Sequence, residues 1–258
     1  MGRPLPTRRA VLAGALATGV ATALFPGAAH AGGRQPRTID PHSRSRVDPR
    51  SISCVDTRKR VVALTFDDGP DPASTPQVLE VLEHFGVPAT FFMIGRNVVE
   101  HGELVTEVVR RGHQVANHSQ DHLWLDRQPP GVVQRQVDLG AQSLVRAGAP
   151  PNRLFRPPHG WTSGTVADVL GQEGSRSIFW SDCLEHHLAL GPPSAAVAAM
   201  AERVLPGSIL LCHDGGHLDG PHPQSFDRSA TVAALPHLLE AVLARHLRFV
   251  TVSELTGV

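Results

Sequence analysis

The sequence predicts an α/β fold built on a parallel sheet over residues 61–258, and two observations support this prediction. From Val61 onward, short apolar runs alternate with stretches of helical apolar spacing, an order typical of a parallel sheet. Polar side chains suited to catalysis directly follow several of the apolar runs, and parallel sheets collect functional residues at the carboxyl ends of their strands. About seven such units in about two hundred residues are closer to a (β/α) barrel than to an open sheet.

Seven strands and six helices are expected. The strands are Val61–Thr65, Thr90–Ile94, Gln114–Asn117, Leu154–Arg156, Ser177–Trp180, Ser208–Cys212 and Arg248–Thr251. The helices are Thr75–Phe85, Val98–Arg111, Gly131–Ala147, Thr165–Gln172, Ser194–Val204 and Thr231–His246. The first helix has Thr75 at its cap and Pro76 at its first helical position, where proline is favoured.

Residues 1–31 have the pattern of an export signal. Arg8 and Arg9 precede a mildly apolar segment, which ends in the A-x-A cleavage pattern of residues 29–31. This arrangement resembles a twin-arginine signal, and a general secretion signal that happens to contain two arginines is the alternative. Residues 32–60 are rich in Arg, Pro and Ser and predict a disordered linker. We therefore expect a protein that is secreted or held at the cell wall, with residues 61–258 as its catalytic domain and no membrane span in the mature chain.

Charge and cysteine content narrow the possibilities further. The formal net charge is zero, so nothing suggests nucleic acid as a partner. Three cysteines are present, and an odd number in an exported chain leaves at least one unpaired. Cys183 and Cys212 each lie near the end of a predicted strand, so a disulfide between them and a pair of buried free thiols are equally open.

The candidate metal-binding residues follow the first and third predicted strands. Asp67 and Asp68 are adjacent carboxylates that repel each other, which indicates a cation or an arginine nearby. His118 and His122 have the H-x3-H spacing that lets two imidazoles reach one metal ion. The spacing alone is weak evidence for a metal site, because about one such pair is expected by chance in this chain and two occur. The position of this pair directly after a predicted strand is what favours a metal site. One Asp with two His leaves positions open for water and substrate.

Further polar residues follow the later strands. Arg156 ends the fourth strand and can hold a carboxylate through two hydrogen bonds. Asp182 follows the fifth strand, and His213 follows the sixth. His213 can serve as a general acid, and a core histidine at a strand end is the alternative.

Taken together and in order, four motifs resemble those of the polysaccharide deacetylases, the NodB-homology family, which is the fourth family of carbohydrate esterases. They are TFDDGP at 65–70, H-x3-H at 118–122, R-P-P-x-G at 156–160 and L-x-H-D at 211–214. The resemblance covers about residues 61–255 and implies a distorted, incomplete (β/α) barrel with a groove at its carboxyl end. It also implies a divalent metal ion, with zinc expected and cobalt as the alternative, bound by Asp68, His118 and His122.

The resemblance assigns roles to the remaining motif residues. Asp67 matches the catalytic base, Arg156 the residue that orients this base, and His213 the general acid. Leu211 matches an apolar wall that receives the acetyl methyl group. The loop of Pro158, His159 and Gly160 is expected to bind substrate, with a backbone N–H that hydrogen-bonds the oxyanion.

The chain departs from the family pattern at three places. His159 stands where the family usually has tyrosine, and Cys183 stands where it has aspartate. We expect Asp182 to take over the role of that aspartate by pairing with His213 and raising its pKa, with Glu185 as the alternative. Residues 216–226 form an extra loop, for which substrate selection and an inert insertion are equally open.

The expected activity is removal of N-acetyl groups from peptidoglycan or chitin-type oligosaccharides, with release of acetate, by a protein that acts as a monomer. One alternative is an O-acetyl esterase acting on xylan, since the motifs do not separate esters from amides. Another is a catalytically silent glycan-binding protein, against which the complete set of motif residues argues. An unrelated metal hydrolase such as a phosphoesterase is disfavoured because basic residues for phosphate are sparse.

Overall fold

The computed structural model describes residues 51–216 and 227–258. Within these residues the centre is a parallel sheet of eight strands in the order β5-β4-β3-β2-β1-β7-β6, with β8 also paired to β1. The predicted export signal, residues 32–50 of the predicted linker and most of the extra loop lie outside the described residues. The strands are β1 (Val61–Asp67), β2 (Thr90–Met93), β3 (Gln114–Asn117), β4 (Leu154–Phe155), β5 (Arg176–Ser177), β6 (Asp182–Cys183), β7 (Ile209–His213) and β8 (Arg248–Val250).

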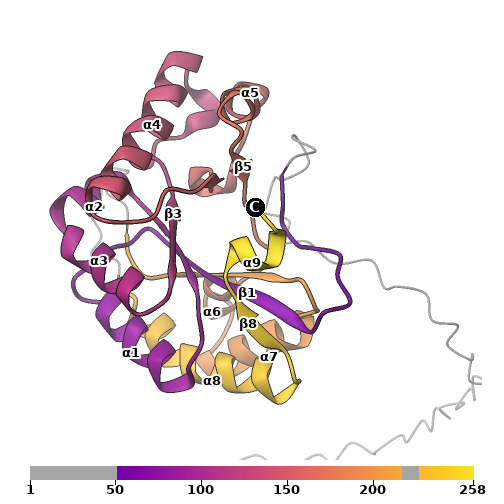
Figure 1. The fold of residues 1–258 in the computed structure, drawn as a ribbon. Helices are drawn as coiled ribbons and strands as arrows, with labels where there is room; N and C mark the ends of the chain where they lie inside the picture. The colour runs from indigo at the N-terminus through magenta and orange to yellow at the C-terminus, as the bar shows by residue number, and fades with distance from the viewer. Residues whose placement is uncertain (1–50, 217–226) are drawn as a thin grey trace, which may run out of the picture. The chain divides into compact units, whose positions relative to one another are not determined.

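Strand β1 lies at the centre of the sheet and changes neighbours along one side. β7 pairs with Ala63–Asp67 on one side of β1. On the other side, β8 pairs with Val61–Ala63 and β2 pairs with Thr65–Asp67. The amino and carboxyl halves of β1 therefore have different partners, and the sheet is curled rather than flat (Figure 1).

The two outermost strands of the sheet, β5 and β6, are consecutive in the chain. One short segment therefore pairs with β4 at one edge and with β7 at the other, which curls the sheet into an incomplete barrel. Ile52 pairs with Ile178 of the same segment, and Cys54 pairs with Ser208, just before β7. The prediction of a disordered linker is wrong for residues 52–55, because the backbones of Ile52 and Val55 are hydrogen-bonded to the barrel.

Alternate side chains of β1 belong to two different cores. The even-numbered residues, 62 to 66, pack in a large apolar cluster between the sheet and the helices. Val61 and Ala63 belong to a second cluster, inside the curl of the sheet. The odd-numbered row continues through Thr65 to Asp67, so the side chain of Asp67 lies on the inner face at the carboxyl end of the strand.

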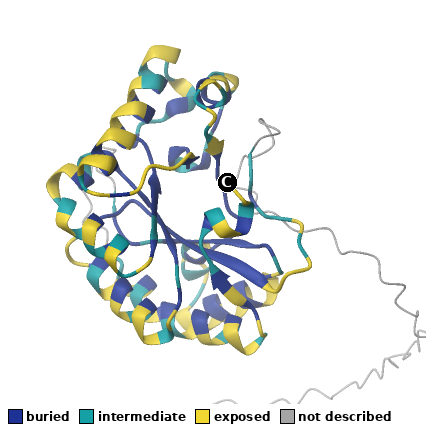
Figure 2. Ribbon diagram, in the orientation of Figure 1, coloured by how far each residue is buried: buried dark blue, intermediate teal, exposed yellow. Residues whose placement is uncertain are grey.

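Helices cover the outer face of the sheet and expose only their outward sides, while the strands are almost entirely buried (Figure 2). Helix α1, for example, buries Val78, Leu79 and Leu82 at helical spacing and ends at Gly86, whose φ of 62° suits a glycine. The helices are α1 (Thr75–Phe85), α2 (Gly95–Glu100), α3 (Gly102–Arg110), α4 (Pro130–Arg146), α5 (Gly164–Gln172), α6 (Leu184–Leu188), α7 (Pro193–Arg203), α8 (Ser229–Ala244) and α9 (Val252–Thr256), with 3-10 turns η2 (Leu125–Arg127) and η3 (Pro158–Gly160).

All six predicted helices are present, with two corrections. The predicted helix Val98–Arg111 is two helices, α2 and α3, because the chain leaves helical geometry at His101 (φ −133°, ψ 44°). Thr75 is the first residue of α1 rather than its cap. Strand β6 and the short helices α6 and α9 were not predicted. No helix in the described part of the chain is long and apolar enough to cross a bilayer.

Candidate active site

The candidate residues meet at the carboxyl end of the sheet, at the ends of four of its parallel strands. Asp67 ends β1, His118 follows β3, Arg156 follows β4 and His213 ends β7. Asp67 and His213 are directly opposite each other in the register of β1 and β7. All of these side chains are buried except that of His213, which is 22% exposed.

Asp68, His118 and His122 form a buried set of potential metal ligands. Oδ1 of Asp68 lies 3.5 Å from Nε2 of His118 and 3.2 Å from Nε2 of His122. This oxygen is buried and accepts no hydrogen bond. The ligand atoms all lie within 4.8 Å of one another, as binding a single ion requires. Burial alone would raise the pKa of Asp68, but His122 and His118 hold it well below its usual range.

The ring of His118 is fixed by a second contact. Its Nδ1 lies 2.7 Å from the carbonyl oxygen of Arg156, so Nδ1–H donates to that carbonyl and the lone pair of Nε2 faces Asp68. Metal-binding histidines in proteins are oriented in this way. The donor set of one carboxylate oxygen and two imidazole nitrogens therefore fits a zinc-type ion.

The backbone around these ligands is strained. Asp68, Ser119 and His122 have φ of 72°, 69° and 57°, in the left-handed region that non-glycine residues rarely occupy. Each such residue costs about 1–3 kcal/mol unless its surroundings hold it in place. Here Asn97 donates to the Asp68 carbonyl at 2.8 Å, and the Ser119 hydroxyl accepts from the His122 N–H at 3.0 Å. Local hydrogen bonds thus hold the backbone of two potential ligands, Asp68 and His122, in this conformation.

Asp67 is held by a fully buried arginine. Nη1 of Arg156 lies 2.5 Å from Oδ1 of Asp67, and the same guanidinium donates to the Thr65 hydroxyl and to the carbonyls of Ile178 and Phe179. Every nitrogen of the guanidinium therefore has a partner. The other oxygen of Asp67, Oδ2, lies 3.7 Å from Nε2 of His118 and so faces the potential metal ligands.

His213 pairs with Glu185, not with Asp182. Nδ1 of His213 lies 2.9 Å from Oε2 of Glu185. Burial would lower the pKa of His213, but the charge and hydrogen bond of Glu185 outweigh it and raise the pKa. His213 and Thr231 in turn overcome the effect of burial on Glu185 and lower its pKa to about 2.

The predicted pairing of Asp182 with His213 is wrong because of strand alternation. Asp182 pairs in register with Leu210, whose side chain belongs to the outer core, whereas Cys183 pairs with Leu211 of the inner core. Asp182 therefore points toward the helices, where its carboxylate binds Nε of Arg203 at 2.8 Å and Nε2 of His187 at 3.0 Å. Glu185, the alternative, reaches His213 from the first turn of α6.

This set of residues can be compared with known proteins. The sequence model described as polysaccharide deacetylase matches residues 55–178. A peptidoglycan-N-acetylglucosamine deacetylase of Bacillus cereus is 35% identical over 202 residues, which cover 78% of this chain and 90% of that protein. The chain belongs to the polysaccharide deacetylase family.

Two further similarities support this assignment. A chitooligosaccharide deacetylase of Bradyrhizobium is 38% identical over 192 residues, which cover 72% of this chain and 86% of that protein. A crystal structure of a peptidoglycan N-acetylglucosamine deacetylase with a bound N-hydroxybenzamide superimposes with a TM-score of 0.72 at 25% identity, covering 80% of this chain and 92% of the other. The predicted family and its incomplete barrel are both confirmed.

In this polysaccharide deacetylase the predicted substrate loop, Pro158–Gly160, lies beside the potential metal ligands. The ring of His159 is 4.4 Å from that of His122 and stacks on Trp124 at 3.8 Å and 11°. Trp124 was not predicted, because nothing in the sequence indicates that η2 packs on this loop. His159 has a φ of 59°, Pro158 has no backbone N–H, and the N–H of Gly160 donates to the Pro157 carbonyl.

Leu211 lies where an apolar wall is expected. It is 2% exposed, belongs to the inner core and lies two residues before His213 on the same face of β7. Cys183 and Cys212 are both free thiols, of which Cys183 belongs to the inner core and Cys212 to the outer core. The possible disulfide between them is therefore not formed.

Asp214, which follows the sixth predicted strand but was assigned no role from the sequence, is a buried carboxyl group next to the site. Its Oδ2 accepts a hydrogen bond from the Thr75 hydroxyl at 2.6 Å, and its backbone N–H donates to the Asp67 carbonyl at 3.1 Å. Burial is the main reason that the pKa of Asp214 is raised to about 7. The negative charges of Asp68 and Asp67 raise this pKa further, whereas the hydrogen bond from Thr75 lowers it. The L-x-H-D motif contains this residue, but nothing in the motif indicates that the carboxyl group is buried.

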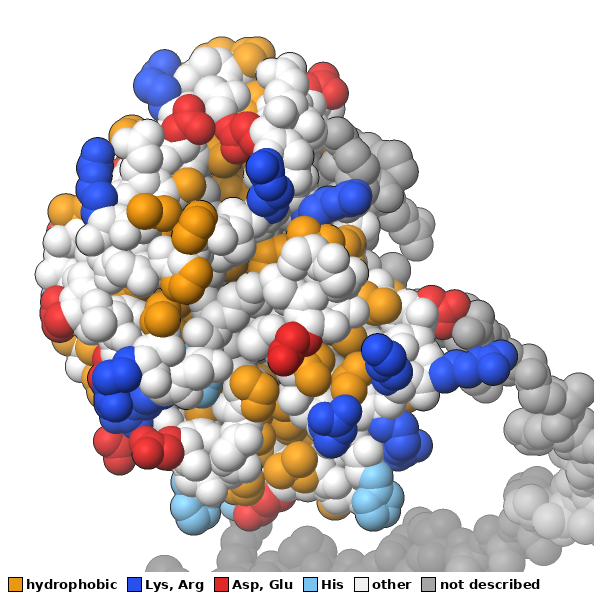
Figure 3. Space-filling view, viewed as in Figure 1, with side chains coloured by type: hydrophobic (Ala, Val, Ile, Leu, Met, Phe, Trp, Pro, Cys, Tyr) orange, Lys and Arg blue, Asp and Glu red, His pale blue; other side chains and the backbone are white. Residues whose placement is uncertain are grey.

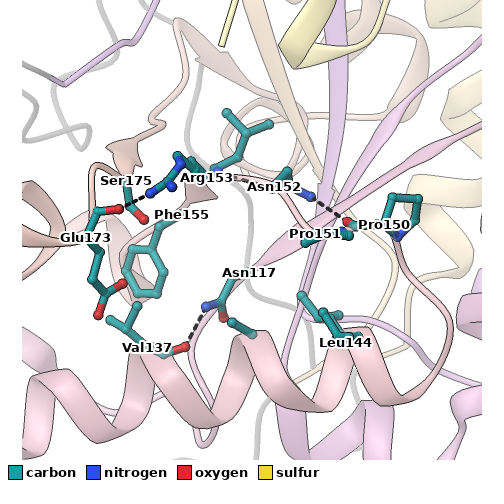
Figure 4. Close-up of a pocket in the computed structure, with 13 residues that line it drawn as sticks. Asn117, Val137, Leu144, Pro150, Pro151, Asn152, Arg153, Phe155, Glu173 and Ser175 are labelled. Carbon is teal, nitrogen blue, oxygen red and sulfur yellow. Dashed lines mark hydrogen bonds between the residues drawn. The ribbon is translucent and has the colours of Figure 1, made fainter.

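A separate cavity of about 460 Å³ lies between α4 and the residues around β4 and β5 (Figure 4). The Asn117 amide donates to the Val137 carbonyl on one side of the cavity, and Arg153 donates to the Glu173 carbonyl on the other (Figure 4). None of the predicted site residues lines this cavity.

Proposed function

We propose that this polysaccharide deacetylase is an exported, metal-dependent hydrolase that removes N-acetyl groups from glycans and releases acetate. Peptidoglycan and chitin-type oligosaccharides are the proposed substrates. One observation carries the proposal: three potential metal ligands, an arginine-held carboxylate and a glutamate-supported histidine meet at one end of the sheet.

Asp68, His118 and His122 would hold the divalent ion, which we propose to be zinc, with cobalt able to replace it. When bound, the ion would polarise the acetyl carbonyl and lower the pKa of a water molecule. The unsatisfied Oδ1 of Asp68 and the fixed tautomer of His118 both support this assignment.

Asp67 is the proposed general base. Hydrolysis adds water to the acetyl carbon, and the proton of that water needs an acceptor. Arg156 occupies Oδ1 of Asp67, which leaves Oδ2, on the side of the potential metal ligands, to take the proton. Because Arg156 is fixed by carbonyls as well as by Thr65, its role is to hold this carboxylate in one orientation.

His213 is the proposed general acid. The leaving group would be an amide anion unless a proton reached the nitrogen, so the reaction needs a donor. Nδ1 of His213 faces Glu185, so the proton would be delivered from Nε2. The raised pKa keeps more of the imidazole protonated near neutral pH, as a donor requires.

The acetyl group would be bound by Leu211 and the η3 loop. Leu211 offers an apolar wall two residues before His213, and a backbone N–H of the η3 loop is the proposed donor to the developing oxyanion. If this donor is what the loop contributes, histidine can replace the usual tyrosine without loss. Pro158 and Gly160, both buried, fix the shape of the turn.

A neutral substrate suits this site better than a phosphate ester. Every guanidinium nitrogen of Arg156 is already hydrogen-bonded within the protein. On the face shown in Figure 3, Lys and Arg side chains lie at several places, with one group of them at the lower right, and Asp and Glu side chains lie among them elsewhere. Arg228 lies near the site, but its guanidinium is already paired within the protein. Its Nη2 lies 3.6 Å from the carboxylate of Asp68, and its Nε donates to the carbonyl of Gly215.

Acetate release from chitooligosaccharides, peptidoglycan and acetylxylan tests the proposal. The protein is stripped with a chelator and then supplied with zinc or cobalt. We expect release from the N-acetylated glycans to stop with the chelator and to return with the metal. Release from acetylxylan alone would favour the esterase, and glycan binding without any acetate release would favour the silent binding protein.

The proposed export depends on residues 1–31. Amino-terminal sequencing of the mature protein from the culture medium is expected to begin at Gly32. Replacing Arg8 and Arg9 with lysine is expected to block export by the twin-arginine route, whereas unchanged export would favour the general secretion route.

A further inference from the structure

A second set of metal-binding side chains lies beside the proposed general acid. Cys183, Glu185 and His213 each offer one ligand atom, and these atoms lie within 4.8 Å of one another. Oε2 of Glu185 is 2.9 Å from Nδ1 of His213 and 3.4 Å from Sγ of Cys183. A tetrahedral zinc ion holds its ligand atoms roughly 3–4 Å apart, so this spacing needs little adjustment.

Strand parity brings these three side chains together. Cys183 pairs in register with Leu211, and both side chains lie on the inner face of the sheet. His213 follows Leu211 by two residues and so projects from the same face. Glu185, two residues after Cys183, lies in the first turn of α6 and places its carboxylate between the thiol and the imidazole.

The three side chains differ in how far they are exposed. The side chains of Glu185 and His213 are 20% and 22% exposed, whereas Cys183 is 1% exposed. An ion would therefore enter past the carboxylate and the imidazole and meet the thiol last. Thiolate and imidazole ligands select zinc over magnesium or calcium, and three protein ligands leave a fourth position for water.

We propose that Cys183, Glu185 and His213 form a second, inhibitory zinc site. Binding would convert the thiol to a thiolate, with its proton released to water, and would occupy Nδ1 of His213 with the metal. The imidazole would then be unable to take up the second proton that a general acid needs. The inhibitory consequence rests on the proposed function, whereas the binding of zinc does not.

This second site should fill after the first. The first set, Asp68, His118 and His122, contains no thiol, so no thiol proton has to be released when a metal ion binds there. The thiol of Cys183 is buried against the carboxylate of Glu185 and must lose its proton before it can bind the metal, which lowers the metal affinity of this site. Inhibition is therefore expected at zinc concentrations above those that activate the enzyme.

A cobalt titration of the metal-free protein tests the binding directly. The ligands of the first site are nitrogen and oxygen, so the first equivalent of cobalt is expected to give no sulfur-to-metal charge-transfer band. The second equivalent is expected to produce such a band in the near ultraviolet. Cys183→Ser should abolish the band, and Glu185→Gln should shift its appearance to at least tenfold higher cobalt.

Cys212→Ser is the matched control, since Cys212 is also a buried thiol and adjoins His213 but belongs to the outer core. This variant is expected to keep the band, and Cys183→Ala provides a second test should the serine variant unfold. A wild-type protein without the band, or a band that persists in both Cys183 variants, would overturn the site.

Acetate release then tests the inhibitory consequence. Excess zinc is expected to inhibit the wild-type enzyme, with a midpoint at least tenfold higher in Cys183→Ser. Equal inhibition of the two proteins would overturn the inhibitory role. If no acetate were released at any zinc concentration, the proposed function would fail, while the cobalt band would still decide whether the site exists.

Discussion

Glu185 holds His213 at two points. One carboxylate oxygen lies 2.9 Å from Nδ1 of the ring, and the other accepts the backbone N–H of the same residue at 3.0 Å and the hydroxyl of Thr231 at 2.8 Å. The ring is thereby fixed in orientation and favoured in its protonated form. Glu185 thus occupies the role that an aspartate at the position of Cys183 fills in the family pattern.

Replacing Glu185 with glutamine should weaken the general acid. The pKa of His213 is raised by Glu185, and the acid works only while protonated, so activity falls as the pH rises through that pKa. Without the carboxylate the pKa drops, and the basic limb of the kcat/KM profile should move to lower pH. We expect about a tenfold to hundredfold loss of kcat/KM at neutral pH.

Asp182→Asn is the matched control for this experiment. It makes the same carboxylate-to-amide change nearby, but Asp182 binds Arg203 and His187 rather than His213. Its basic limb should coincide with that of the wild type. A shift in the Asp182 variant, with none in the Glu185 variant, would contradict the assignment.

The main strands and the residues at their ends could be predicted from the sequence, because buried parallel strands are continuous apolar runs. On this basis His118 and His122 were expected to meet one of the two adjacent carboxylates. The family resemblance selected Asp68 as that carboxylate, and the structure brings these three residues together. Glu185 could not be preferred over Asp182, because β6 is only two residues long and pairs through a register that no local pattern reveals. The pairing of Ile52 with Ile178 could not be predicted either, because it is a single bridge in a segment whose composition is typical of a linker.

Asp68→Asn should remove the metal and with it the activity. The amide supplies no charge, and its oxygen would be the weakest of the three ligands. Metal content after dialysis is expected to fall more than about tenfold. Asp121→Asn is the control, since Asp121 lies between the two histidines in sequence but is hydrogen-bonded to Gln136 instead. If the Asp68 variant retained a full equivalent of zinc, the proposed ligand set would be wrong.

Asp214 should make the metal-free protein less stable as the pH rises from about 4 to about 7. The folded protein keeps this carboxyl protonated up to its raised pKa of about 7, whereas the unfolded chain loses the proton near the ordinary aspartate value. The unfolded state binds fewer protons across this interval, so its relative free energy falls as the pH rises. Thermal unfolding of wild type and Asp214→Asn at several pH values measures the effect.

The asparagine variant keeps an oxygen that can accept the hydrogen bond from Thr75 but has no proton to lose. The difference in melting temperature between wild type and variant should therefore change steadily in favour of the variant toward pH 7. A constant difference across the interval would show that Asp214 does not titrate there.

Gly140 allows α4 to approach the loop of residues 118–122, which contains two of the potential metal ligands. An alanine at this position should disturb that loop. A Cβ atom at Gly140 would lie 2.3 Å from the side-chain oxygen of Asn117 and 2.9 Å from the backbone of Ser119, between the two histidine ligands. We expect Gly140→Ala to destabilise the protein by about 1–3 kcal/mol and to weaken metal binding.

Gly131, in the first turn of the same helix, is exposed and its Cβ would meet nothing closer than 3.8 Å. Gly131→Ala should therefore leave metal binding unchanged and raise stability by up to about 1 kcal/mol. Thermal unfolding and zinc content distinguish the two variants, and equal behaviour would show that the close approach of α4 does not position the ligands.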